Sequence, residues 1–158
     1  MSNTYIEHSM VINNFVTTVG KQLKSSMCRV FGANVKYKWV ENDNKPVIPD
    51  VSINCDIKNR RATNFMGVPR FIMEVVADST EKNDCTVKME LYKSVEVDEY
   101  WIVDWRKRQV EIYILDYDEN ETPKYYLHNT ITEQNKEELR IIHFPNVKVN
   151  FDELFNIE

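Results

Sequence analysis

The stretch that decides the fold begins VIPDVSINCD (residues 47–56), continues through FIMEVVAD (71–78) and DCTVKMELY (84–92), and ends EYWIVD (99–104). Its hydrophobic pattern predicts a strand, a polar loop, a second strand, a helix and a third strand. Each of the first three regular elements contains a polar residue that packing alone would not place there: Asp50, Glu74 and Lys88. If these side chains converge, two carboxylates and an ammonium group meet at one site.

The remaining elements extend this pattern on both sides. Helices are expected over Glu7–Met27, over Asp78 to about Val95 with Asp78 and Glu81 as a capping box, and over Phe151–Phe155. Strands are expected over Cys28–Phe31, Asn34–Val40, Val47–Cys55, Arg70–Ala77, Glu99–Trp105, Val110–Leu115, Tyr125–Leu127 and Leu139–His143. Strands that flank a helix and are followed by hairpins indicate the α/β class, with a mixed central β-sheet flanked by helices.

Length and composition favour one globular domain over residues 1–158, with a net charge of −5. The sequence contains no apolar run long enough to span a bilayer, and MSNTYIEH lacks the pattern of a signal peptide. Cys28, Cys55 and Cys85 are odd in number and lack C-x-x-C spacing. We therefore expect no disulfide framework and a cytoplasmic location. The acidic balance disfavours broad affinity for nucleic acid, which would need a local basic patch.

Glu74 lies between Ile72 and Val76 on one strand face, with apolar residues on the other face as well. A carboxylate buried there needs a cation, a hydrogen-bond network or a metal ion, because an unpaired buried charge is very costly. A structural salt bridge is the competing interpretation. Asp50 follows Pro49, a pair that also simply opens strands and turns. Two carboxylates on neighbouring strands that point to one face would bind a hard cation such as Mg²⁺ or Mn²⁺.

Lys88 falls on the helix face that is expected to pack on the sheet, in one arc with Asp84, Leu91 and Val95 and with Val87 and Tyr92 at its edges. A lysine normally avoids such a position. It is either a partner in a structural ion pair with Glu74 or Asp84, or a functional group beside the two carboxylates. Because a metal ion activates water and an ammonium group offsets negative charge, the combination indicates phosphodiester hydrolysis.

The motifs PDVSI, G-x-P-x-F-x-x-E-V-V-A-D-S-T, D-x-x-x-K-x-x-x-Y and EYWIVD resemble the putative restriction endonuclease family of the PD-(D/E)XK nuclease superfamily. The resemblance implies a restriction-endonuclease-like core in which Asp50, Glu74 and the main-chain carbonyl of Val75 bind the metal. The superfamily pattern has a lysine two residues after the glutamate, where this chain has Val76. The resemblance implies that the lysine has migrated to the following helix, as Lys88.

The accessory candidates are Glu7 and His8 at the start of the first helix and Asp84 and Tyr92 on the second helix. Glu7 is the candidate for the superfamily's helical glutamate, whereas His8 lies on the apolar stripe and is interpreted as a core histidine rather than a ligand. Relatives usually have a further strand before this helix, and this chain starts almost at the helix.

The leading hypothesis is a metal-dependent endonuclease acting on DNA, in which a homodimer would supply two sites for two strands. Two clusters, Lys58, Arg60 and Arg61 and then Arg106–Arg108, could contact phosphate, although such clusters are usually solvated loops. The acidic balance, Val76 and the short N-terminus support an alternative, a catalytically degenerate binding module that acts as an inhibitor or regulator of a protein partner. A third interpretation is that the polar core residues only stabilise the fold.

Overall fold

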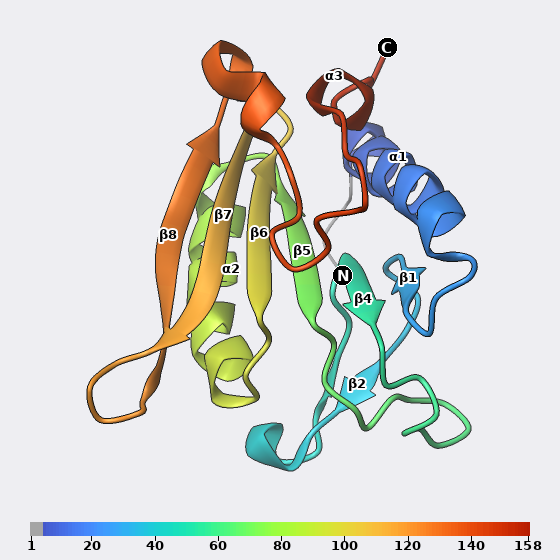
Figure 1. Cartoon of the computed structure of the whole chain (residues 1–158), viewed down its shortest axis with the longest axis vertical. Helices are drawn as coiled ribbons and strands as arrows, with labels where there is room; N and C mark the ends of the chain where they lie inside the picture. The colour runs from blue at the N-terminus through green and yellow to red at the C-terminus, as the bar shows by residue number, and fades with distance from the viewer. Residues whose placement is uncertain (1–4) are drawn as a thin grey trace.

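A computed structural model of the chain describes residues 5–158 and contains a six-stranded mixed sheet in the order β1-β4-β5-β6-β7-β8 (Figure 1). The strands are β1 (Arg29–Phe31), β4 (Val51–Asn54), β5 (Phe71–Val76), β6 (Glu99–Asp104), β7 (Gln109–Tyr117) and β8 (Pro123–Ile131). β5 and β6 pair in parallel, and every other neighbouring pair in this sheet is antiparallel. The predicted α/β class, with a mixed sheet flanked by helices, is confirmed.

Helices cover both faces of this sheet. The crossover helix α2 (Ser79–Ser94) lies behind the sheet in Figure 1, whereas α1 (Ile6–Leu23) and the short α3 (Phe151–Leu154) lie on the opposite side. Alternate side chains of β5 therefore enter two different cores. Phe71, Met73 and Val75 pack with α1 and α3, and Ile72 and Val76 pack with α2. This two-sided burial explains why FIMEVV reads as apolar on both faces.

The predicted strand Val47–Cys55 is divided into two. β3 (Pro46–Val47) pairs with β2 (Tyr37–Lys38) in a separate two-stranded sheet, while β4 joins the main sheet. Pro49 lies between them and cannot donate a main-chain hydrogen bond, which favours a break in the ladder. The predicted strand Asn34–Val40 is likewise shortened to β2, and the 3₁₀ turn η1 (Val40–Asn42) follows it. The break places Asp50 just before β4.

The prediction of a strand over Leu139–His143 is wrong. The segment has no strand ladder, and the carboxylate of Glu99 accepts hydrogen bonds from the main-chain N–H groups of Ile142 and His143, at 3.1 and 2.9 Å. The same carboxylate, which is fully buried on β6, accepts from Trp101 Nε1 and pairs with His143 Nδ1. The apolar alternation of the segment reflects one-sided packing onto the sheet, not strand pairing.

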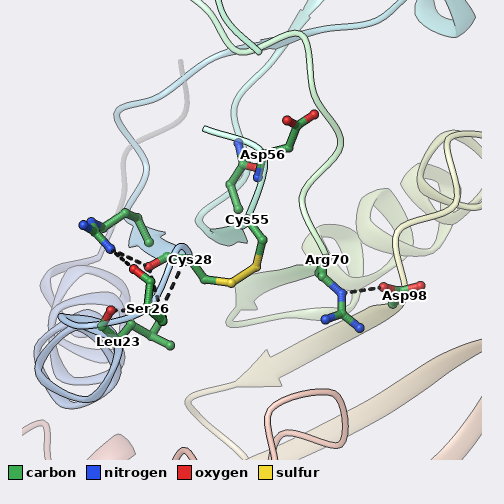
Figure 2. The surroundings of a disulfide bond; sticks show 9 residues. Leu23, Ser26, Cys28, Cys55, Asp56, Arg70 and Asp98 are labelled. Carbon is green, nitrogen blue, oxygen red and sulfur yellow. Dashed lines mark hydrogen bonds and ion pairs between the residues drawn. A yellow bond between two sulfur atoms is a disulfide. The ribbon is translucent and has the colours of Figure 1, made fainter. Parts of the chain in front are cut away.

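The cysteines, for which no disulfide framework is expected from the sequence, contain one disulfide and one free thiol. Cys28 and Cys55 form a disulfide that links the ends of β1 and β4, next to the paired residues Arg29 and Asn54 (Figure 2). The two cysteines lie 27 residues apart, so their pairing depends on how the strands align. Cys85 is free and buried. The cytoplasmic location, which was inferred partly from the cysteines, stays a prediction.

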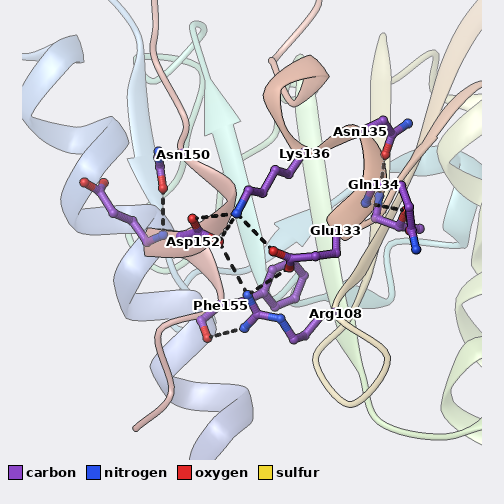
Figure 3. A network of polar contacts seen from close by, with 10 residues as sticks. Arg108, Glu133, Gln134, Asn135, Lys136, Asn150, Asp152 and Phe155 are labelled. Atoms are coloured by element: carbon purple, nitrogen blue, oxygen red, sulfur yellow. Dashed lines mark hydrogen bonds and ion pairs between the residues drawn. The ribbon is translucent and has the colours of Figure 1, made fainter.

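Ion pairs connect the C-terminal elements to the β6–β7 turn (Figure 3). Asp152 of α3 accepts hydrogen bonds from Lys136, which lies in the 3₁₀ segment η2 (Glu133–Glu138), and Arg108 lies near both Asp152 and Glu133. No helix within residues 5–158 is long and apolar enough to cross a membrane. Residues 1–4, part of the stretch expected to lack a signal peptide, lie outside the described residues.

Candidate active site

The break before β4, the middle of β5 and the inner side of α2 meet at a cleft of about 230 Å³. Most of the residues singled out from the sequence line it. The lining consists of Tyr5, His8, Asp50, Glu74, Val75, Val76, Glu81, Asp84, Cys85, Lys88 and Trp105. Glu7, in the first turn of α1, is not among them. Every residue of the predicted site except Glu7 and Tyr92 therefore lines this cleft. Tyr92 is connected to it by a hydrogen bond to Glu74.

Glu74 is the buried centre of the cleft, with only 3% of its surface exposed. Its Oε1 accepts a hydrogen bond from the Tyr92 hydroxyl at 3.1 Å, and its Oε2 lies 3.7 Å from Lys88 Nζ. Burial, followed by the negative charge of Asp50, raises the pKa of Glu74 to about 8, although Lys88 and the Tyr92 hydroxyl act in the opposite direction. The protein groups around Glu74 therefore do not fully stabilise the anionic form of its carboxyl group.

Asp50 is held beside Glu74 by two groups. Its Oδ2 accepts the main-chain N–H of Val75 at 2.8 Å and lies 3.1 Å from His8 Nε2. The interpretation of His8 as a core histidine is wrong, because the side chain lies at the cleft and its Nδ1 has no hydrogen-bond partner among residues 5–158. The hydrogen bond to Asp50 raises the pKa of His8, and burial partly opposes it.

The main-chain carbonyl of Val75 faces the same edge of β5 as Asp50. Val76 O accepts a hydrogen bond from Trp105 N on the β6 side at 3.1 Å. Because successive peptide groups of a strand point to opposite edges, the carbonyl of Val75 points away from β6. The carbonyl of Val75 therefore lies on the Asp50 side of β5, and Val75 lines the same cleft as Asp50 and Glu74.

The helix α2 brings Lys88 over the cleft. Asp78 caps this helix as predicted by accepting the N–H of Glu81, but the Glu81 side chain bonds the N–H of Ala77, one residue before the cap. Burial lowers the pKa of Lys88, but the charges of Glu74, Cys85 and Asp50 outweigh it and raise the pKa overall. Lys88 therefore stays protonated at neutral pH.

The helix face differs from the predicted arc. Cys85 and Tyr92 are its buried residues, and Val87 is 74% exposed. Lys88 lies at the border of this face, where its stem packs and its ammonium group reaches the cleft. Four residues that line the cleft were not predicted at the site: Tyr5, Glu81, Cys85 and Trp105. The sequence contains no residue type or spacing that would have identified them.

No group of three or more His, Cys, Asp and Glu side chains that could hold a metal ion occurs in the part of the chain that the structure describes. The predicted ligand set is of a different kind, since it contains two carboxylates and a main-chain carbonyl. All three are oxygen donors, which are the ligands that Mg²⁺ and Mn²⁺ prefer.

The chain thus combines a mixed sheet, a crossover helix between its two parallel strands and a cleft lined by acidic side chains. A sequence model of the Uma2 family, described as "Putative restriction endonuclease", matches residues 1–145, and the chain belongs to this family. Its fold is similar to the crystal structure of a putative nuclease of the DUF820 group from Anabaena variabilis ATCC 29413. That similarity has a TM-score of 0.71 at 13% identity and covers 98% of this chain and 83% of the other.

An uncharacterized protein of Synechocystis sp. (strain ATCC 27184 / PCC 6803 / Kazusa) is 28% identical over 107 residues. The match covers 67% of this chain and 56% of that relative. The chain thus spans little more than half the length of this curated relative.

Proposed function

We propose that the protein is a metal-dependent endonuclease that hydrolyses phosphodiester bonds of DNA at the cleft formed by Asp50, Glu74 and Lys88. The observation that carries this proposal is the buried carboxyl of Glu74, which lies between Asp50 and Lys88 at the wall of an open cleft. The family's description and the nuclease-like fold support the same chemistry.

Asp50, Glu74 and the carbonyl of Val75 would hold one Mg²⁺ or Mn²⁺ ion. The donor set fits such an ion because it offers only oxygen atoms. A cation would also offset the burial and the repulsion from Asp50 that together raise the pKa of Glu74. When bound, the ion would supply a water of lowered pKa and stabilise charge on the scissile phosphate.

The protein groups around these oxygens have separate tasks. The Tyr92 hydroxyl and the Val75 N–H orient the two carboxylates, and His8 holds Asp50 from the side of α1. Lys88 presents a permanent positive charge to the open side of the cleft, where it would orient the attacking water and offset negative charge on the phosphate.

The proposal is tested first without DNA, by calorimetric titration of Mn²⁺ into wild type, Asp50→Ala and Glu90→Gln. Glu90 is an exposed carboxylate of α2 that pairs with Lys93 and serves as the matched control. We expect wild type and Glu90→Gln to bind Mn²⁺ and Asp50→Ala not to bind it. Equal binding by all three would place the metal elsewhere and contradict the proposed ligand set.

Cleavage of supercoiled plasmid then tests the reaction. We expect Glu74→Gln to lower the rate at least about 100-fold and Lys88→Met to do so while it still binds Mn²⁺. A folded wild type that binds neither metal nor plasmid would contradict the nuclease and favour the alternative, a nuclease-fold module that binds a protein partner.

A further inference from the structure

The charges of this acidic chain are unevenly distributed. The segment between α1 and β5, residues 24–70, contains nine Lys and Arg against four Asp and Glu, a net charge of +5. The rest of the chain contains eleven against twenty-one, a net charge of −10. The negative total therefore conceals one strongly basic region, which occupies β1, β2, β4 and the loops below them in Figure 1.

The cations of this basic segment also differ in how they are paired. Of its nine, only Arg70 has an acidic partner within 4.0 Å in the described structure, namely Asp98 (Figure 2). Six of the eleven cations elsewhere are in ion pairs, including Arg108 and Lys136 (Figure 3). Free positive charge is thus concentrated in residues 24–61, where it is available to an anionic partner.

Three of these cations are gathered at a second cleft, of about 260 Å³, by main-chain hydrogen bonds. Phe65 N donates to Lys36 O at 2.8 Å, and Arg61 N donates to Asn64 O at 2.9 Å. The loop that carries Arg60 and Arg61 is thereby held against the start of β2, and Lys36, Arg60 and Arg61 line the cleft above the rings of Phe31 and Phe65. All three side chains are exposed.

Buried contacts connect the segment that carries Lys36 to the elements of the candidate active site. The hydroxyl of Tyr37, the residue after Lys36, lies 2.8 Å from Ser52 Oγ, two residues along the chain from Asp50. The Trp39 ring, which packs against Tyr37, also contacts Tyr92, and the Tyr92 hydroxyl donates a hydrogen bond to Glu74. Residues 36–39 are thus packed, through the buried rings of Tyr37 and Trp39, against the elements that carry Asp50 and Glu74.

We infer that residues 24–61, with the cleft of Lys36, Arg60 and Arg61 at their centre, form the surface that binds the sugar–phosphate backbone of duplex DNA beside the proposed cleavage site. This inference rests on the proposed function. The clustered free cations would bind phosphate without reading sequence, while the acidic remainder of the molecule repels the duplex and so restricts it to this face.

The test is fluorescence anisotropy of a short fluorescein-labelled DNA duplex in EDTA, over a series of KCl concentrations. The variant is Arg60→Ala/Arg61→Ala. Its matched control is Arg140→Ala/Lys148→Ala, which removes two exposed cations without ion pairs from the C-terminal segment that packs on the opposite face of the sheet. Thermal melting checks that both variants fold.

We expect the Arg60/Arg61 variant to bind at least about tenfold more weakly and its plot of log affinity against log salt to be shallower by about two, one for each lost phosphate contact. The control should match wild type. Equal affinities for all three proteins, or equal losses in both variants, would overturn this surface and leave the cleavage test of Glu74→Gln unaffected. Failure of wild type to bind the duplex at the lowest salt would also overturn it, whatever the outcome of the Mn²⁺ titration.

Discussion

Glu74 is the residue whose chemistry depends most on its surroundings. Its folded-state pKa is about 8, because burial and Asp50 disfavour the anion, whereas its ordinary value is 4.5. Between these two pH values the folded protein retains a proton that the unfolded chain has lost. The free energy of unfolding therefore decreases as the pH rises through this range.

Glu74→Gln is neutral at every pH and should lack this dependence. In metal-free buffer we expect the free energy of unfolding of wild type to fall, relative to the variant, by at most about 1.4 kcal/mol per pH unit from about pH 5 to about pH 8. Urea unfolding at a series of pH values measures the difference, with Glu90→Gln as the exposed control. Parallel curves for wild type and Glu74→Gln would show that Glu74 titrates normally in the folded protein.

For individual residues, sequence and structure agree on the side chains whose charge does not match the apolar pattern around them. Glu74 in an apolar strand and Lys88 on the packing side of a helix were noticeable because their surroundings are wrong for a charge. His8 was misinterpreted for the opposite reason, since a histidine on an apolar stripe fits a core equally well. Only the approach of α1 to Asp50, 42 residues away, distinguishes the two.

Among the elements, β4 depends on two neighbours for its position. It pairs with β5 on one side and with β1 on the other, and the disulfide fastens the β1 side. Because β1 has only three residues, few main-chain hydrogen bonds hold it in place. The disulfide should therefore contribute much of the stability of this edge of the sheet.

The variant Cys28→Ser/Cys55→Ser should be less stable than the oxidised wild type by about 3 kcal/mol, as expected for a closed loop of this length. Guanidinium unfolding with and without a reductant measures the effect. Wild type in reductant should match the variant, and Cys85→Ser serves as a control for the loss of a thiol. Equal stability of oxidised and reduced wild type would contradict a stabilising role for this bond.

For the molecule as a whole, the carboxylate of Glu99 joins the sheet to the C-terminal segment. It accepts hydrogen bonds from Trp101 on its own strand and from two main-chain N–H groups of a segment more than 40 residues away. That segment covers the α1 side of the sheet with Ile141 and Val147. Loss of this carboxylate would leave several buried donors without an acceptor.

Glu99→Ala should lower the free energy of unfolding by about 3 kcal/mol or more. Urea unfolding gives the magnitude, and limited proteolysis should show faster cleavage within residues 139–149. The exposed Glu137→Ala is the control. A loss below about 1 kcal/mol would mean that water or other groups replace the carboxylate without cost.

The sequence by itself determined the α/β class, the strand–helix–strand centre and the three charged residues of the candidate site. Local periodicity and the cost of burying charge are both properties of short stretches, and therefore they can be recognised in the sequence. Only the tertiary structure decided the Cys28–Cys55 bond, the contact of His8 with Asp50 and the non-strand course of Leu139–His143. Each of these three features depends on which segments, distant in the sequence, lie next to each other in space. Strand order and helix packing determine these neighbours, and no local sequence pattern encodes them.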